Sequence, residues 1–198
     1  MKKTKEKKID CKTFTIQELE TELKRETYQS KYLKILSSTI YALIVVAAIS
    51  ALVATLVMPV LQISGSSMTP TFIEGEIVFS VKTKKLNQGD IVAFYHGNKI
   101  LIKRVIAGSG SWVNITIDGD VYVNGVLLEE GYVKDKTLGE TNITYPYQVP
   151  DGQWFVLGDH RETSIDSRNT EVGCISIDDI VGKIIFRVWP LNRFGKIY

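Results

Sequence analysis

Hydrophobic and polar residues divide the chain into a charged N-terminal segment, one long apolar run and a region of short apolar stretches. The apolar run covers residues 35–58, which are 24 consecutive positions without a charged side chain. A helix of that length rises about 36 Å, enough to cross the ~30 Å hydrocarbon core of a bilayer. A helix in a globular core does not need apolar residues on every face, and the apolar part of a cleaved signal peptide is shorter, about 7–15 residues. We therefore predict a retained transmembrane helix over residues 35–58.

Short stretches rich in Val, Ile, Phe and Tyr follow the apolar run, and Gly, Asn and Asp separate them. This pattern is typical of β-strands, and no long helical periodicity follows residue 58. Asn124-Gly125, between two such stretches, is the strongest hairpin signal in the chain. We predict a mainly β domain over residues 59–198, with an antiparallel barrel or sandwich-like fold. The predicted strands cover residues 76–81, 90–95, 99–107, 111–117, 121–128, 154–157 and 180–188.

Charge predicts which side of the membrane each end of the chain occupies. Residues 1–34 carry 10 Lys and Arg against 6 Asp and Glu, whereas residues 59–198 carry 14 against 16. Because basic residues flank the cytoplasmic end of a membrane helix, we predict a cytoplasmic N-terminal segment and an extracytoplasmic domain at the outer face of the cell membrane. Cys11 and Cys174 would then lie on opposite sides and could not form a disulfide. A short amphipathic helix is predicted over residues 15–25, with Phe14 just before it.

A polar loop directly after the predicted anchor contains the first candidate for chemistry. Residues 64–71 read SGSSMTPT, and the glycine and proline favour an exposed turn with a partly fixed backbone. A nucleophilic serine needs such a turn for its hydroxyl oxygen to project. Clusters of this composition are also common in loops that have no chemistry, so other parts of the sequence must decide between the two interpretations.

A pair of adjacent cations interrupts one of the predicted strands. Strand alternation places Lys103 on the face of Leu101 and Val105, and Arg104 on the face of Ile102. One of the two cations must therefore face an apolar side. Desolvation lowers the pKa of a buried lysine, and its neutral amine can act as a general base. Alternatively, the strand lies at a sheet edge and both side chains extend into water.

Acidic, basic and hydroxyl side chains alternate in residues 158–168, GDHRETSIDSR, directly after an apolar strand. This composition suits a hydrogen-bonded, ion-paired loop that holds other groups in place, although a solvated loop shares it. A Ser-His-Asp triad through Asp159 and His160 is disfavoured, because adjacent residues of an extended chain point in opposite directions. His96 is the other histidine and no HExxH motif occurs, so we predict neither a metal site nor a cofactor.

Taken together, these motifs resemble those of the type I signal peptidases, which are membrane-anchored serine proteases with a Ser/Lys dyad. The family motif S-M-x-P-T matches residues 67–71, and G-D-[IV]-V matches residues 89–92. K-R-V matches residues 103–105, and most of G-D-N-x-x-x-S-x-D-S-R matches residues 158–168. The four motifs occur in the family's order behind one N-terminal anchor.

The resemblance implies a role for each matched residue. Ser67 is implied as the nucleophile, with its N–H as an oxyanion donor, and Lys103 as the general base. Gly65 occupies the position where some members place a second oxyanion donor. The supporting residues implied are Ser164, which orients the lysine, and Asp159, Asp166 and Arg168, which brace that loop.

The resemblance also implies the substrates. These are preproteins held in the lipid bilayer by a signal peptide and cut after small residues in an Ala-x-Ala-like sequence, near the secretion translocon. No nucleic-acid partner is expected. An extended substrate would pair with edge strands, as in β-augmentation. The residues implied to contact it are Ile63, Ser64, Ser66, Ile100, Leu101 and Ile102.

The match has two departures from the family pattern. His160 stands where asparagine is usual, and AGSGS at residues 107–111 replaces the usual turn after the lysine motif. Neither belongs to the dyad, so the resemblance implies altered loops and an active enzyme. An alternative function is an accessory protein of surface-fibre or pilus assembly without peptidase activity, but such a protein would lack Ser67 or Lys103. Self-cleaving repressor peptidases share the dyad, but they are soluble and carry a DNA-binding helix-turn-helix, so the predicted anchor disfavours them.

Overall fold

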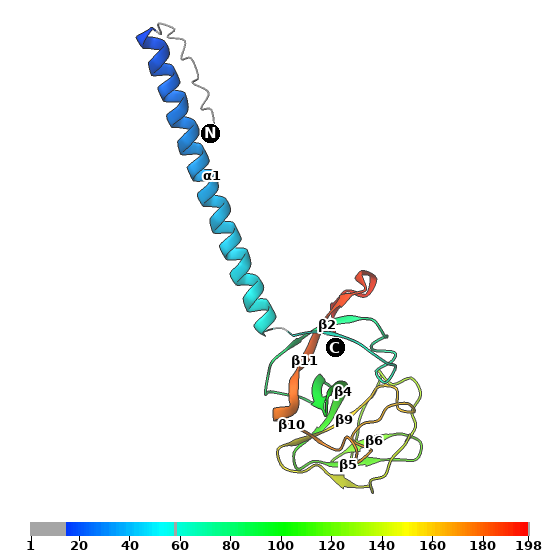
Figure 1. Cartoon of the computed structure of the whole chain (residues 1–198). Helices are drawn as coiled ribbons and strands as arrows, with labels where there is room; N and C mark the ends of the chain where they lie inside the picture. Colours follow the sequence, from blue (N-terminus) through cyan, green and yellow to red (C-terminus); the bar gives the residue numbers. More distant parts are fainter. Residues whose placement is uncertain (1–14, 58, 198) are drawn as a thin grey trace, which may run out of the picture. The chain divides into compact units, whose positions relative to one another are not determined.

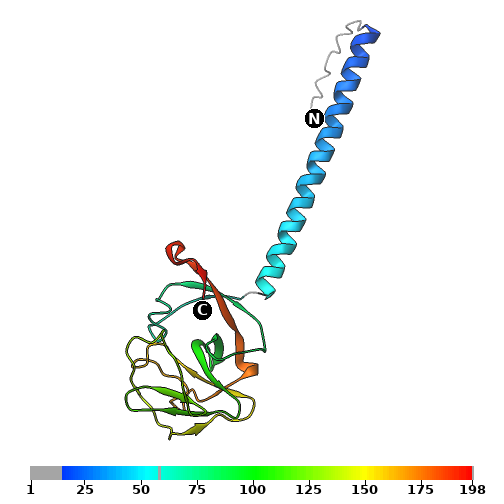
Figure 2. The ribbon, with the colours of Figure 1, turned by 180° about the vertical axis from the view of Figure 1, so that it is seen from behind.

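The computed structural model describes residues 15–57 and 59–197, which belong to two separate compact units. The first unit ends at Leu52 and contains most of one long helix, α1 (Ile16–Val57). The second unit begins at Val53 and contains every β-strand of the described residues (Figure 1). Figure 2 shows the same ribbon from behind.

The helix α1 is continuous over 42 residues, so the predicted short N-terminal helix and the predicted anchor form one element. No glycine or proline occurs between residues 16 and 57, so nothing interrupts the backbone hydrogen bonds of the helix. Pro59, which has no N–H to donate, follows the helix. Phe14 and Cys11 lie outside the described residues, and Cys174 carries a free thiol.

Among the described residues, α1 is the one helix long and apolar enough to cross a membrane, over Leu19–Leu52. Its large apolar side chains are exposed: Leu43 is 65% exposed and Ile44 60%. Because no part of the described chain covers these side chains, they need an apolar surrounding, as a bilayer provides. The helix therefore supports membrane anchoring, while the anchor's ends at residues 35 and 58 and its orientation stay predictions.

Two antiparallel sheets form the second unit, which confirms the predicted mainly β class. The larger sheet has the order β1-β2-β11-β3-β4-β9-β10, and β12 pairs with β11. Its end strands do not pair with each other, so it is not a closed barrel, and the sandwich-like alternative fits better. Its strands are β1 (Val60–Gln62), β2 (Ile77–Val81), β3 (Ile91–His96), β4 (Lys99–Gly108), β9 (Gln153–Leu157), β10 (Ile175–Ser176), β11 (Ile180–Trp189) and β12 (Gly195–Lys196).

The smaller sheet has the order β7-β6-β5-β8 and contains the predicted hairpin. Asn124 (φ 51°) and Gly125 (φ 80°) both have positive φ, as the central residues of a tight type I′ hairpin require. The sheet's strands are β5 (Trp112–Ile115), β6 (Val121–Val123), β7 (Val126–Leu127) and β8 (Tyr147–Gln148). Two short 3₁₀ turns, η1 (Ile177–Asp179) and η2 (Leu191–Arg193), flank β11.

Every predicted strand region contains an observed strand, and the strands that the sequence missed are the shortest ones. β1, β8, β10 and β12 have two or three residues each, which is too few to show an alternating pattern. β1 matters for the site because it leads directly into the loop at residues 64–71, called the serine loop below, which contains Ser67. It pairs only with β2.

We predict that charges in the middle of α1 abolish membrane retention. Replacing Leu43, Val46 and Ile49 with lysine should move the chain from the membrane pellet to the supernatant in alkaline carbonate extraction, because each charge at a helix centre costs about 3 kcal/mol in a bilayer. The matched triple alanine variant should stay in the pellet. Equal retention of both variants would show that α1 is not the anchor.

Candidate active site

Residues 67–71 form a turn that is fixed by apolar residues around it. Met68 and Phe72 are 3% and 0% exposed, and Ile63 packs in the same buried cluster. The Phe72 N–H donates to Met68 O at 2.8 Å and closes the turn. Ser67, between these anchor points, is half-buried. The loop therefore presents the serine from a backbone that the core holds in place.

The structure brings Lys103 to Ser67. The Lys103 Nζ lies 2.9 Å from the Ser67 Oγ, and the two atoms share a hydrogen bond. Lys103 is only 3% exposed, so it is a buried lysine, and the alternative of a solvated edge residue is wrong. It lies on β4 opposite Val92 of β3, one residue before the pairing between β4 and β9 begins at Arg104.

Burial lowers the pKa of Lys103 from 10.5 to about 8. Desolvation of the ammonium group is the main cause of this shift. Asp166 and Asp159 raise the pKa and Arg168 lowers it, so the neighbouring charges oppose one another. A lysine with this pKa carries an appreciable fraction of neutral amine at mildly alkaline pH, as a general base requires.

Asp166 is the centre of the loop at residues 158–168. Its Oδ1 accepts a hydrogen bond from Arg168 Nε at 2.8 Å, and its Oδ2 accepts one from Arg168 Nη2 at 2.9 Å. Its Oδ2 also accepts from the Ser164 hydroxyl at 2.7 Å and from the Gly158 N–H at 2.9 Å. Both charged side chains are buried, so this is an ion-paired loop and not a solvated one.

Ser164 is held by Asp166, and among the described residues its hydroxyl makes no hydrogen bond to Lys103. Its side chain nevertheless lies near the nucleophile. A Cβ on Gly158 would contact the Ser164 hydroxyl and would lie 2.6 Å from the Ser67 carbonyl oxygen. Gly158 thus allows two segments to approach closely. They are the turn at residues 67–71, called the serine turn below, and the loop at residues 158–168, called the orienting loop. The lysine-orienting role of Ser164 stays a prediction.

Arg104, next to the lysine, joins three parts of the site. Its Nε donates to Asp159 Oδ1 at 2.9 Å and its Nη2 to Oδ2 at 2.7 Å, in a bidentate buried pair. Its Nη1 donates to the Gly89 carbonyl at 2.9 Å. Asp159 also accepts a hydrogen bond from the Thr71 hydroxyl in the serine turn. The pair therefore links the lysine strand, the orienting loop and the serine turn.

Sequence reasoning missed a second buried ion pair, which Tyr132 connects to Arg104. Arg161 pairs with Glu130, and both side chains are at most 1% exposed. Glu130 also accepts a hydrogen bond from the Tyr132 hydroxyl at 2.8 Å, and the Tyr132 ring lies 3.8 Å from the Arg104 guanidinium. Burial raises the pKa of Tyr132, so it stays a neutral donor. Glu130 follows another glutamate in the sequence, and such a pair is typical of a solvated surface, so no local signal marked it.

His160 does not reach the dyad. Its ring Nδ1 lies 3.2 Å from Thr69 Oγ1 and 3.0 Å from Thr163 Oγ1. Its backbone N–H donates to the Ser67 carbonyl at 3.1 Å. Among the described residues, the ring makes no hydrogen bond to Ser67 Oγ, so the geometry gives no support to a Ser-His-Asp triad.

A groove of about 190 Å³ lies beside Ser67. Its walls come from two chain segments far apart in sequence, the end of β1 with the serine loop and the first part of β4. Of the predicted substrate contacts, Ser66 is not in the wall. The lining residues are Leu61, Gln62, Ile63, Ser64, Gly65, Ser67, Met68, Ile100, Leu101 and Ile102.

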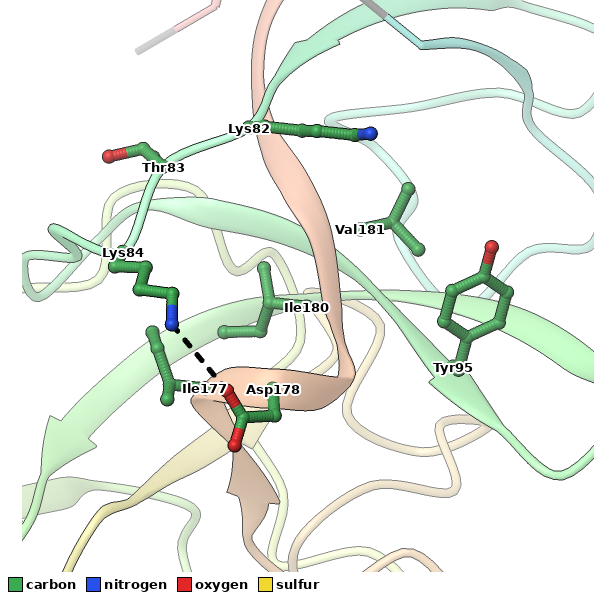
Figure 3. Close-up of a pocket in the computed structure, with 8 residues that line it drawn as sticks. All are labelled: Lys82, Thr83, Lys84, Tyr95, Ile177, Asp178, Ile180 and Val181. Carbon is green, nitrogen blue, oxygen red and sulfur yellow. Dashed lines mark ion pairs between the residues drawn. The ribbon is translucent and has the colours of Figure 1, made fainter.

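A larger hollow, of about 460 Å³, lies elsewhere in the β unit (Figure 3). The segment after β2, the end of β3, the turn η1 and the start of β11 form it. Lys84 Nζ and Asp178 Oδ1 form an ion pair there at 3.7 Å. None of the predicted site residues belongs to its described lining. The catalytic geometry therefore points to the smaller groove.

Known proteins with similar sequences identify the family of this chain. The family model described as "Signal peptidase, peptidase S26" matches residues 36–189. Signal peptidase IB of Staphylococcus aureus is 39% identical over 153 residues, which are 67% of this chain and 78% of that protein. Thylakoidal processing peptidase 1 of Arabidopsis thaliana is 36% identical over 149 residues, and the match spans 67% of this chain but only 42% of that protein.

Among solved structures, the crystal structure of a signal peptidase I from Enterococcus faecalis is 32% identical, with a TM-score of 0.43. The match covers 52% of this chain and 98% of that one. On the family match, this chain belongs to the signal peptidase family, peptidase S26. It is a serine peptidase of that family, and its long apolar helix fits a membrane anchor.

We predict that Gly158→Ala lowers peptidase activity by about 100-fold, because the new methyl group would push the Ser164 side chain and the Ser67 carbonyl apart. The measurement is the rate of peptide-bond cleavage by purified full-length protein. Gly131→Ala is the matched control, since a Cβ there meets no atom within 4 Å. Activity of Gly158→Ala within twofold of the control would contradict this close approach.

The lowered pKa of Lys103 also predicts a pH-dependent stability. Between pH 8 and 10.5 the unfolded chain would hold the lysine proton and the folded chain would not, so folding becomes more favourable as pH rises through this window. Relative to Lys103→Met, the free energy of unfolding of the unchanged chain should therefore rise by about 3 kcal/mol. Chemical unfolding in detergent at several pH values measures the difference. Parallel curves for the two proteins would show that the ammonium is not desolvated.

Proposed function

We propose that this serine peptidase removes N-terminal signal peptides from exported preproteins with a catalytic dyad of Ser67 and Lys103. The observation that carries the proposal is the 2.9 Å contact between the Lys103 Nζ and the Ser67 Oγ. The lysine is buried and its pKa is lowered to about 8, so a neutral amine is available beside the hydroxyl.

The chemistry follows from these two groups. The neutral Lys103 amine takes the proton of the Ser67 hydroxyl as Oγ attacks the scissile carbonyl carbon. The resulting ammonium gives that proton to the leaving amine when the peptide bond breaks, which leaves an acyl ester on Ser67. The leaving amine is the new N-terminus of the mature protein, so the acyl group on Ser67 is the signal peptide. Water then gives a proton to the Lys103 amine and attacks the ester carbonyl. As the ester bond breaks, the ammonium returns that proton to Ser67 Oγ, and the signal peptide leaves with a free carboxylate.

The backbone N–H of Ser67 is the proposed donor to the oxyanion. Among residues 15–57 and 59–197 it has no hydrogen-bond acceptor, so it is available to a ligand. Gly65, with φ at 85°, forms the bend before the turn, and no atom lies within 4 Å of the place where its Cβ would be. Gly65 supplies no side-chain donor, and the second donor of the family is not assigned to it.

The groove suits an extended peptide. Strand β4 pairs with β9 only from Arg104 onward, so residues 99–103 have an unpaired edge facing the groove. β1 likewise pairs with β2 alone. A preprotein segment can add to both edges by main-chain hydrogen bonds, with side chains from Ile63, Ser64, Ile100 and Leu101 around it. Its small volume of about 190 Å³ favours small residues before the cut, as in Ala-x-Ala.

In this proposal, α1 and the signal peptide of the substrate lie in the same bilayer. We assign residues 1–34 to the cytoplasm and residues 59–198 to the outer face of the cell membrane, because basic residues precede the apolar run. A preprotein that is still held by its signal peptide then meets the site at a high effective concentration, close to the secretion translocon.

We predict that Ser67→Ala and Lys103→Ala each reduce cleavage of a preprotein with an Ala-x-Ala site by about 1,000-fold or more, because each removes one member of the dyad. The cleavage rate of the unchanged chain should rise with pH through about 8, as the Lys103 amine loses its proton. Gel separation of precursor and mature protein over a pH series measures both effects.

Ser109→Ala and Lys134→Ala are matched controls, since both residues are exposed and neither lines the groove beside Ser67. Normal cleavage by Lys103→Ala alone would overturn the dyad and make His160 the next base to test. No cleavage by the unchanged chain would overturn the proposed function and favour a non-enzymatic accessory protein.

A further inference from the structure

Two arginines from the C-terminal part of the chain contact the last two residues of the serine turn, Pro70 and Thr71. Arg187, on β11, donates an Nη2–H to the carbonyl oxygen of Thr71. Arg193, in η2, lies with its Nη2 3.4 Å from the carbonyl oxygens of both Pro70 and Thr71. Cationic donors thus surround the last carbonyl groups of the turn that begins at Ser67.

Glu76 joins the two arginines. Its Oε1 lies 2.6 Å from Arg193 Nη1, and its Oε2 lies 2.8 Å from Arg187 Nε. Glu76 is only 3% exposed, so its charge needs both cations. Because Glu76 comes directly before β2, the three side chains tie the start of β2 to β11 and η2 across the turn.

Thr71 is therefore fixed from two sides. Its hydroxyl donates to Asp159 in the network beside the lysine, and its carbonyl accepts from Arg187. The guanidinium of Arg187 also lies 5.4 Å from the ring of Phe72, the next residue. A shift of Thr71 would be transmitted through the short, hydrogen-bonded turn to Ser67.

We propose that Arg187 and Arg193, joined through Glu76, are positioning residues for the serine turn. They keep the Ser67 hydroxyl against Lys103 and its N–H aimed at the oxyanion, and they do not touch the substrate groove. This role rests on the proposed function of Ser67. Arg187 lies within the family match and Arg193 lies beyond residue 189, where that match ends.

The test compares Arg193→Ala, Arg193→Lys and the neighbouring exposed Asn192→Ala in the full chain. Single-turnover cleavage with enzyme in saturating excess gives a rate constant that does not depend on the fraction of molecules that fold. Arg193→Ala should lower it about tenfold with half-saturation and pH midpoint unchanged, because neither the groove nor Lys103 contacts Arg193. Arg193→Lys should recover most of the rate, since it keeps a cation beside Glu76, and Asn192→Ala should match the unchanged chain.

An unchanged rate constant for Arg193→Ala, even with lower thermal stability, would overturn the positioning role while leaving the proposed function intact. Amide hydrogen exchange gives a second readout that needs no cleavage. Exchange in residues 66–72 should be faster in Arg193→Ala than in Asn192→Ala, with exchange in β9 unchanged. If the unchanged chain does not cleave the preprotein, the proposed function fails, and equal exchange in the two variants would then overturn the positioning role as well.

Discussion

The burial of Lys103 is the constraint on which the rest of the β unit depends. An ammonium group without water is unstable, and the same loss of water brings its pKa down to about 8. Burial thus weakens the fold at this point and favours the neutral amine that the proposed dyad needs. The apolar clusters on both faces of β3, which include Ile91 on one side and Val92 on the other, offset that cost.

The other buried cations around the site differ from Lys103 because each has a carboxylate partner. Arg104, Arg161 and Arg168 each have a buried carboxylate partner. Among the described residues, Lys103 is the buried cation that forms no ion pair, and its contact is the Ser67 hydroxyl. If a carboxylate were bound directly to Lys103, its charged form would be stabilised and its pKa would rise. The arginines therefore hold the acidic groups and leave Lys103 without a direct carboxylate partner, as the proposed dyad needs.

The predictions from sequence succeeded where a short local pattern of residue types determines the structure. Strand alternation predicted that Lys103 or Arg104 faces an apolar side, and both side chains are buried. Asn124-Gly125 marked a turn whose two central residues have positive φ. They were incomplete where pairing is non-local. Glu130 and Arg161 are 31 residues apart, and no spacing rule indicates their contact. The extent of α1 beyond the apolar run was also missed, because a charged lead and an apolar run can share one uninterrupted helix.

The sequence by itself determined the mainly β class, one apolar helix, the family motifs and the identity of the two candidate residues, because each of these is written in short patterns of residue type. Only the tertiary structure decided that Lys103 lies 2.9 Å from Ser67, that its charge is buried and that arginines from the C-terminus reach the serine turn. Burial and pairing depend on which strands come together across the sheet, and residues 36 positions apart carry no local record of that contact.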